Sequence, residues 1–424
     1  MRAALLFQGV RTLGSNVLAF IARVTADGAT LITNIPFVNW NLKRLKGDEG
    51  ILMIPSAVKP TVLYNQIPDI PPADFTVSRP FPTTYTDENG ILQTAPNNVA
   101  RVDFSEGTGI GSLLIEEEGT NLVTHSLELT PYFQLDSGIV KTLNYGISPD
   151  GTNNSTRLVY PSINKGCYKS LIQSESSFSM WVKGVAGETI FIGDYVNTVG
   201  ELTILTGDWQ RVVKIFESTT LQISTRFNST ALDIEVYGVQ FEIGSIATSY
   251  IKTEGTTVTR PPDQITNGGA SQDIDSENGA FIIESKALAS TGVTRPILLT
   301  DSTGDNRIEI SYGLTNIVNV VAHKGGEIIT KVSFEVTDVT EFIKVGVRYQ
   351  VTGLSVWIAG TKVYEDLTFV SYAPNTLSTV RYMDFDGNVF ASRVNATRVL
   401  KGVVLDSEMI DRTQGTNVVV SQPI

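Results

Sequence analysis

Hydrophobic and polar residues alternate along most of this chain in short runs that are separated by Gly, Asn and Asp. Alternation with a period of two predicts β-strands that bury one face, and the small polar residues between the runs predict turns. From residue 101 to about residue 259 the runs are "SLLIEE", "STRLVYPS", "SFSMWVKG", "TIFIGD", "WQRVVKIF", "TLQISTRF" and "ALDIEVYGVQFEIG". They recur at intervals of roughly 8 to 12 residues, which is typical of a β-sandwich or jelly roll.

A second series of alternating runs begins at Gly279 and includes "AFIIESKA", "RPILLTDS", "NRIEISYG", "NIVNVVAH", "EIITKVSF", "FIKVGVRYQ", "LSVWIAG", "TKVYEDL" and "ASRVNATRVLKG". It ends in "VVLDSEMIDRTQG", where we expect Ser407 to cap a short helix. A chain of 424 residues also exceeds the roughly 250 that one core usually supports. We therefore predict a mainly β protein with two tandem β-sandwiches, at residues 101–262 and 263–424.

The N-terminal segment follows a different pattern. One strand-like run extends from Val17 to Val24, and Ala26-Asp27-Gly28 predicts a turn after it. A weakly helical stretch then ends in basic residues at Lys46, as helices often do before a glycine. We predict a small α+β region at residues 1–60 that anchors the chain to another protein, with a small capping subdomain as the alternative.

A proline-rich connection is expected at residues 61–100. Proline stiffens an extended chain and cannot donate to the interior of a sheet, so this composition predicts a linker. Within it, "TYTDENGILQTA" predicts a β-hairpin, because Asn89-Gly90 between β-prone runs is a strong hairpin signal.

Charge and cysteine content exclude several classes of protein. The formal charge of -12 argues against binding to nucleic acid or to an anionic membrane, since both need a basic face. The single cysteine, Cys167, excludes an intrachain disulfide, so we expect stability to come from packing and from assembly of chains. We find no apolar run of the roughly 18 residues that a membrane span needs, and no secretory signal at the start, so we expect a soluble protein made in a cytoplasm.

Two segments resemble parts of one known module. The segment "TVSRPFPTTYTDENGILQTAPNNVARVDF", continued by "GSLLIEEEGTNLVTHS", resembles a recurring segment of phage virion proteins of the tail-fibre and appendage type. The stretch "YGVQFEIGSIATSYIKTEGTTVTR" is similar to the closing segment of the same module, which completes a carbohydrate-binding-module-like jelly roll. At Glu118-Gly119 the chain departs from the Gln-Arg pair that the module more often carries. In this interpretation Tyr250 and Ile251 pack back on the core.

The C-terminal runs resemble, more loosely, the laminin-G or concanavalin-A-like lectin sandwich that many such virion proteins carry. "DNRIEISYG", "VGVRYQVTGLSVWIAGTKVYED", "LSTVRYMDFDG" and "ASRVNATRVLKGVVLDSEMI" follow that pattern. Together the two resemblances imply a fibre or appendage of a bacteriophage virion, on head or tail. They imply a homotrimer that is assembled in the bacterial cytoplasm, held to other virion proteins by its N-terminal region, and bound to host-surface glycans. The alternative is a capsid or tail decoration or connector protein that binds no glycan.

Catalytic motifs are scarce. The chain has two histidines, His125 and His323, in different predicted domains, so a Ser-His-Asp or Cys-His arrangement has little to draw on. Neither a phosphate-binding glycine motif nor a Cys/His metal spacing occurs. We predict that the protein is not an enzyme, and a glycan depolymerase is the less favoured alternative.

Two oxygen-rich loops are candidates for calcium binding. Asp301 and Asp305 lie in "DSTGDN", and Asp384 and Asp386 lie in "MDFDGN". Calcium takes six to eight oxygen ligands, which such loops can supply. The alternative, which we favour, is that these residues only form Asp/Asn/Gly turns.

Sugar binding would need exposed aromatic rings beside polar side chains. The loop residues Tyr195, Asn197 and Tyr382 are the candidates for this role. Four further aromatic residues lie on or beside predicted strands, where core packing is the favoured interpretation: Trp181, Trp209, Tyr237 and Trp357.

Overall fold

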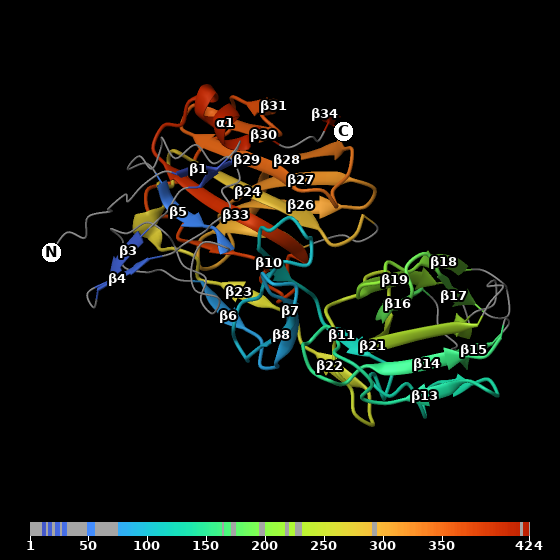
Figure 1. Cartoon of the computed structure of the whole chain (residues 1–424). Coiled ribbons are helices and arrows are strands. Elements are labelled where there is room, and N and C mark those ends of the chain that lie inside the picture. The colour runs from blue at the N-terminus through green and yellow to red at the C-terminus, as the bar shows by residue number, and fades with distance from the viewer. Residues whose placement is uncertain are drawn as a thin grey trace. The chain divides into compact units, whose positions relative to one another are not determined.

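The computed structural model describes residues 49–55, 75–162, 165–170, 175–194, 200–216, 220–224, 231–290, 295–415 and 419–423, and four short strands nearer the N-terminus (Figure 1). These strands are β1 (Arg11–Leu13), β2 (Asn16–Leu18), β3 (Ala22–Thr25) and β4 (Gly28–Leu31). They form two antiparallel pairs, β1 with β2 and β3 with β4. The single strand expected from Val17 to Val24 is therefore divided between β2 and β3. The predicted helix that ends near Lys46 lies outside the described residues.

The chain forms two compact units, which we call unit 1 and unit 2. Unit 1 comprises Met1–Pro80, Asn97–Glu117 and Pro262–Ile424, and unit 2 comprises Phe81–Pro96 and Glu118–Pro261. Among the described residues, strands and turns dominate both units. The prediction of a mainly β protein is confirmed.

Unit 1 is a β-sandwich. Its larger sheet, with the order β31-β30-β29-β24-β33-β10-β9 and with β5 paired to β33, has eight strands within the described ranges. They are β5 (Glu49–Met53), β9 (Val102–Asp103), β10 (Ser112–Ile115), β24 (Gly279–Ala287), β29 (Ile343–Gln350), β30 (Gly353–Ile358), β31 (Thr361–Asp366) and β33 (Ser392–Lys401). The second sheet has the order β32-β25-β26-β27-β28-β34. Its strands are β25 (Ile297–Thr300), β26 (Arg307–Gly313), β27 (Ile317–Lys324), β28 (Glu327–Val336), β32 (Thr379–Arg381) and β34 (Val420–Pro423).

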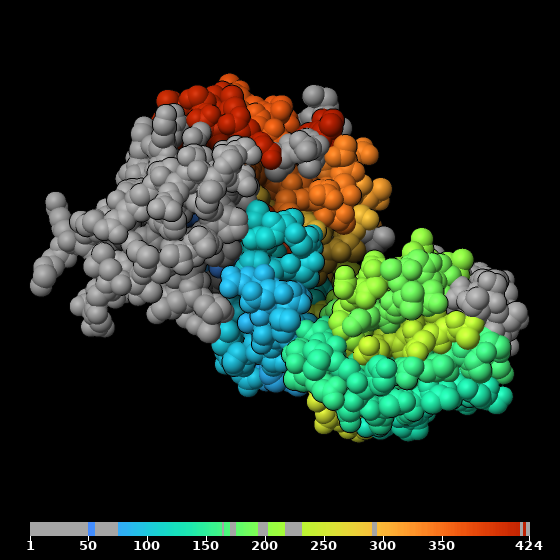
Figure 2. Space-filling view, viewed as in Figure 1, coloured from blue at the N-terminus to red at the C-terminus, as the bar shows by residue number. Residues whose placement is uncertain are grey.

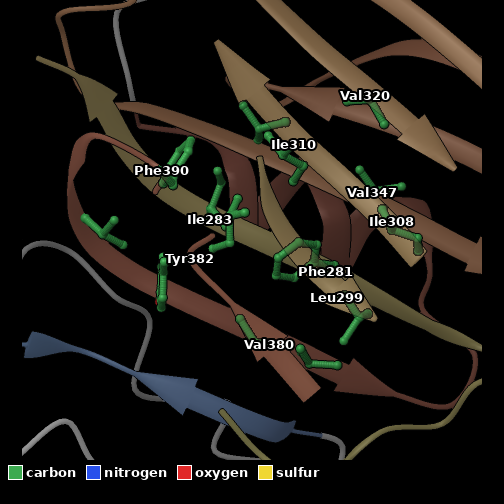
Figure 3. Close-up of a cluster of buried hydrophobic side chains, with 14 of the residues drawn as sticks. Phe281, Ile283, Leu299, Ile308, Ile310, Val320, Val347, Val380, Tyr382 and Phe390 are labelled. Atoms are coloured by element: carbon green, nitrogen blue, oxygen red, sulfur yellow. The ribbon is translucent and has the colours of Figure 1, made fainter. Parts of the chain in front are cut away.

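The core of unit 1 lies between these two sheets. Phe281 and Ile283 of β24 point into it, as do Ile308 and Ile310 of β26 (Figure 3). The intervening residues of β24 face the other side of the larger sheet, where Ile282 packs in a cluster with Met409. Met409 belongs to helix α1 (Asp406–Thr413), so both faces of this central strand are buried.

Helix α1 begins two residues earlier than its sequence suggests. Its N-cap is Leu405, whose side chain makes no capping hydrogen bond, so the expected cap at Ser407 is wrong. The acidic residues Asp406 and Glu408 lie in the first turn instead, where they interact favourably with the helix dipole. Among the described residues, no helix has the length and the apolar character that crossing a bilayer requires.

Unit 2 is a second β-sandwich. One sheet has the order β13-β14-β21-β16-β19 and the other the order β12-β15-β20-β17-β18. The first contains β13 (Val140–Thr142), β14 (Thr156–Tyr160), β16 (Ser176–Lys183), β19 (Gln210–Phe216) and β21 (Leu232–Ile243). The second contains β12 (Gln134–Leu135), β15 (Gly166–Ser170), β17 (Thr189–Asp194), β18 (Gly200–Ile204) and β20 (Thr220–Ser224). Their core includes Phe178, Ile192 and Val236.

A β-bulge shapes the centre of the first sheet of unit 2. The register between β16 and β21 shifts between Ser179 and Trp181. Gly238 lies at the shift with φ of +61°, and a Cβ atom there would lie 3.0 Å from the Trp181 ring. Glycine is therefore needed at this position both for its backbone conformation and for the close approach of the ring.

Two smaller predictions can be compared with the structure. The hairpin around Asn89-Gly90 is confirmed, with β7 (Thr83–Thr86) paired to β8 (Leu92–Ala95). Tyr250 and Ile251 are buried, as expected, but Tyr250 packs in a small cluster with Leu92 and Tyr237 that is separate from the core between the sheets. Two further antiparallel pairs join β11 (Gly119–Asn121) to β22 (Val258–Arg260) and β6 (Thr76–Ser78) to β23 (Gln264–Thr266).

The boundaries of the units differ from those expected at residues 60 and 100. Residues 101–117 belong to unit 1 and not to the first sandwich, because β10 pairs with β33. The hairpin within the expected linker belongs to unit 2, and β5 of the expected anchoring region extends a sheet of unit 1. All four residues of β10 are buried, and Leu113 and Ile115 belong to the core of unit 1. The boundary near residue 262 agrees within one residue.

A buried network of ion pairs in unit 1 ties together three distant segments. Arg79 Nη1 lies 2.5 Å from Asp263 Oδ1, and Arg101 Nη1 lies 2.8 Å from Glu116 Oε2. Arg101 also pairs with Asp263 through its second terminal nitrogen. The four side chains are almost completely buried. Each residue lies within a few positions of a point where the chain passes from one unit to the other. The ion pairs therefore hold these chain segments together within unit 1.

Candidate functional site

The structure contradicts one of the three residues predicted to contact sugar. Tyr382 is completely buried, and its hydroxyl lies 2.5 Å from Thr397 Oγ1 (Figure 3). The alternation of β32 continues past its end, so that Tyr382 points into the core together with Val380. Burial raises the pKa of the Tyr382 hydroxyl far above its ordinary value. The other two candidates, Tyr195 and Asn197, lie outside the described residues.

The two loops that are candidates for calcium binding form turns held by hydrogen bonds within each loop. Asp301 accepts hydrogen bonds from the backbone of Thr303 at 3.0 Å and from Asn306 Nδ2 at 2.8 Å. Asp384 accepts from the backbone of Asp386 at 2.9 Å and from Asn388 Nδ2 at 2.8 Å. Each carboxylate is thus engaged by the loop that carries it, as Asx turns require.

These hydrogen bonds favour the turn interpretation over calcium binding. Asp305 and Asp386 are exposed at the rims of the two loops. In the part of the chain that the structure describes, no group of three or more His, Cys, Asp or Glu side chains could hold a metal ion. The calcium sites proposed at Asp301, Asp305, Asp384 and Asp386 therefore gain no support from the structure.

The remaining aromatic candidates are buried or half-buried, and the two histidines are not brought together. Tyr237 and Trp357 are buried, as predicted, and Trp181 and Trp209 are half-buried. The Trp181 ring packs edge-on against the rings of Tyr237 and Tyr250, each at 5.9 Å between centroids. The two histidines lie in different units, His125 in unit 2 and His323 in unit 1.

A different set of residues forms a partly exposed polar face, on the outer side of the sheet β13-β14-β21-β16-β19. Arg157 of β14 lies opposite Glu235 of β21, and Glu235 lies opposite Lys183 of β16. The alternate residues of the same strands, such as Leu158 and Ile234, fill the core. The alternation that builds the core therefore also places a row of charged side chains on the outer side. Figure 2 shows the green to cyan segment that contains β13 and β14 on the surface of unit 2.

An aromatic ring is fixed beside this row. The Arg157 guanidinium lies over the ring of Tyr145, 4.7 Å from its centroid, in a cation–π arrangement. Arg157 Nε donates to Asp233 Oδ1 at 2.8 Å, and Nη2 pairs with the second carboxylate oxygen at 2.5 Å. Tyr145 is nevertheless 47% exposed. The ring is therefore held in place from one side while much of it remains accessible to a ligand.

The backbone next to Tyr145 is tied to the same row. The backbone amide of Tyr145 donates to the Ser155 carbonyl at 3.0 Å, and the amide of Gly146 donates to Ser155 Oγ at 2.9 Å. Ser155 Oγ in turn donates to Glu235 Oε2 at 2.6 Å. A Cβ atom at Gly146 would lie 2.5 Å from this carboxylate oxygen, so a larger residue there would displace the end of the Glu235 side chain.

The rest of the loop is held by Asp150. This carboxylate accepts hydrogen bonds from Ser148 Oγ at 2.7 Å, from the Thr152 backbone at 2.8 Å and from Asn154 Nδ2 at 2.9 Å. Tyr237 on the sheet below donates its hydroxyl to Asp150 Oδ2 at 2.9 Å. Hydrogen bonds thus hold residues 145–155 in place at both ends and in the middle.

We call Tyr145, Arg157, Lys183, Asp233 and Glu235 the Tyr145 face.

The anchoring by Asp150 should make unit 2 sensitive to acid. Burial by itself raises the pKa of Asp150, but hydrogen bonds from Asn154, Ser148 and Thr152 outweigh it and lower the pKa from 3.8 to about 2. The ionised carboxylate therefore stabilises the fold fully above about pH 4, and this contribution is lost as the pH falls through about 2. We expect an Asp150→Asn variant to be less stable than the wild type near neutral pH, with a difference that shrinks between about pH 4 and pH 2. Urea unfolding of both proteins at several pH values measures this difference. A constant difference across that range would contradict the role of the charge.

The Tyr145 face combines chemical groups that suit a polyhydroxylated ligand. An exposed aromatic ring can stack on the apolar face that the C–H groups of a saturated ligand ring form. The carboxylates of Asp233 and Glu235 can accept hydrogen bonds from hydroxyl groups, and Lys183 can donate them. Sequence reasoning missed Tyr145, although its position in "NYGISPDG", between turn-forming residues, is a signal for an exposed aromatic ring.

Comparisons with known proteins give distant structural similarities. Neither a model of any known protein family nor any curated protein sequence matches this chain. The CBM40 module of the Ruminococcus gnavus IT-sialidase bound to α2,3-sialyllactose is 13% identical, with a TM-score of 0.29, over 33% of this chain and 84% of that one. Domains LG4-5 of the mouse laminin α1 chain are 10% identical, with a TM-score of 0.23, over 68% of this chain and 95% of that one. The tandem CBM22 domains of Paenibacillus barcinonensis Xyn10C are 11% identical, with a TM-score of 0.22, over 68% of this chain and 99% of that one. Since these similarities are low, the functional argument rests on the residues of the Tyr145 face.

Proposed function

We propose that this chain is a glycan-binding attachment protein without enzymatic activity, and that the Tyr145 face of unit 2 is its binding site. The observation that carries the proposal is the exposed Tyr145 ring held over Arg157 beside the charged row. Sugar rings present an apolar face and a rim of hydroxyls, and the Tyr145 face offers a partner to each. The preorganised loop lowers the entropy that would be lost on binding.

We further propose that the protein is a fibre or appendage of a bacteriophage virion. The resemblance of the segments between residues 76 and 260 to phage appendage proteins supports this part of the proposal. In such an assembly a homotrimer would present several copies of a weak site. Their combined avidity would exceed the affinity of one site by a factor of about 10²–10⁴. The residues proposed to anchor the chain to other virion proteins, 1–60, lie mostly outside the described residues.

Removing the Tyr145 ring should weaken glycan binding. We expect Tyr145→Ala to lower the affinity for the bound glycan by about tenfold or more, because the stacking surface is lost. Tyr145→Phe keeps the ring and should retain most of the affinity. The measurement is binding of labelled protein to an array of bacterial and animal glycans, followed by titration with the glycan that binds.

The matched control for this experiment is Val213→Ala, which shortens an exposed side chain on β19 of the same sheet. This variant should bind like the wild type. If the wild-type protein binds no glycan on the array, the proposal is wrong, and a decoration or connector protein becomes the better interpretation. If Tyr145→Ala binds as well as the wild type, a glycan site exists but lies elsewhere.

A further inference from the structure

The two Asp-rich loops, residues 301–306 and 384–388, lie against each other in unit 1. A Cβ atom at Gly304, in the first loop, would lie 2.5 Å from Cε2 of Phe385 in the second. Gly304 has φ of +87°, so its backbone conformation also favours glycine. The missing side chain at Gly304 is thus what allows the Phe385 ring to rest on the first loop.

The Phe385 ring is held by a second contact. The guanidinium of Arg381 lies 4.1 Å from the ring centroid, and Arg381 Nη2 donates to the Asp384 carbonyl at 3.2 Å. Despite both contacts, Phe385 is 40% exposed. This geometry repeats that of Tyr145 in unit 2, where an arginine also supports an exposed aromatic ring.

The carboxylates of Asp301 and Asp384 lock the two loops, as described above, so the ring is presented by a rigid frame. The two loops also carry exposed polar residues, and these include Thr303, Asp305 and Asn388. Their hydroxyl, carboxylate and amide groups can exchange hydrogen bonds with ligand hydroxyls.

The size and surroundings of the ring favour a sugar over a protein partner. In the two loops, residues 301–306 and 384–388, which the structure describes completely, Phe385 is the one large apolar side chain that is exposed. A stable protein interface buries about 800 Å² on each partner and contains an apolar centre of several residues. A single ring with a polar rim instead matches the dimensions of one or two sugar residues.

We infer that unit 1 carries a second glycan-binding site, with Phe385 as its stacking platform and Asp305, Asp386 and Asn388 at its rim. This inference rests on the proposed function and adds a second, independent site to each chain. Two sites per chain would increase the avidity of an oligomer without requiring tight binding at either.

The test compares the full-length wild type, Tyr145→Ala, Phe385→Ala and the double variant on the glycan array. Glycan binding that remains in Tyr145→Ala should fall about tenfold or more when Phe385→Ala is added. Phe385→Tyr keeps a ring and should retain the binding. Far-ultraviolet circular dichroism and thermal unfolding of each variant show whether it is folded.

Two results would overturn the second site and leave the first intact. In one, Tyr145→Ala loses all glycan binding, so that the Tyr145 face accounts for the whole signal. In the other, the double variant binds as much as Tyr145→Ala does. Absence of binding by the wild type would overturn both the second site and the proposed function.

Discussion

Replacing Arg101 with Met should lower the free energy of unfolding of unit 1 by about 3–5 kcal/mol. Arg101 is completely buried and pairs with both Glu116 and Asp263. Its removal leaves carboxylate charge in the interior with fewer partners, and uncompensated buried charge is costly. Urea unfolding, with hydrogen exchange followed on β10 and β33, measures the loss.

The control for Arg101 is an ion pair that is open to solvent. Arg157→Met removes the ion pair with Asp233, in which the Arg157 side chain is 31% exposed and the Asp233 side chain is 49% exposed. Exposed pairs contribute at most about 1 kcal/mol, so this variant should differ little in stability. Equal effects of the two substitutions would show that the buried network does not stabilise unit 1 as described.

Phe178→Ala should be comparably damaging in unit 2, with a loss of about 3–5 kcal/mol. Phe178 lies on β16, an interior strand between β21 and β19, and is completely buried between the two sheets. Truncation removes apolar contacts and leaves a cavity that close-packed neighbours fill only in part. Hydrogen exchange of β14 and β21 should accelerate most.

For Phe178 the comparison variant is Val213→Ala, which lies on β19 of the same sheet but is 43% exposed. Substitutions at such surface positions usually change stability by no more than about 0.5 kcal/mol. A small loss in Phe178→Ala, similar to that of Val213→Ala, would mean that the core of unit 2 is not packed as the structure indicates.

The fold class was predictable because alternation is a local signal. Strands such as β14 and β26 alternate buried and half-buried residues along their length, as the sequence does. It was not predictable from the sequence that β10 belongs to unit 1. Its partner β33 lies far away in the sequence, and no local pattern states which sandwich a buried strand will join.

The errors at the candidate sites have a similar origin. Tyr382 stands beside turn residues and was expected in a loop, but it continues the alternation of β32 into the core. For the aspartates of the two loops the sequence already favours turns over calcium binding, and the structure shows that Asp301 and Asp384 accept hydrogen bonds within their own loops. Tyr145 was missed because its support comes from Arg157 across the turn and from Asp233, which is distant in sequence.

Binding of labelled full-length protein to a panel of bacterial strains tests the central claim most directly, when the wild type is compared with the Tyr145→Ala/Phe385→Ala double variant. We expect the wild type to bind some strains and not others, the double variant to lose this binding, and the free glycan identified on the array to compete with it. Binding that is absent, that does not discriminate among strains, or that survives in the folded double variant would contradict the claim that this chain attaches to surfaces through its two aromatic platforms.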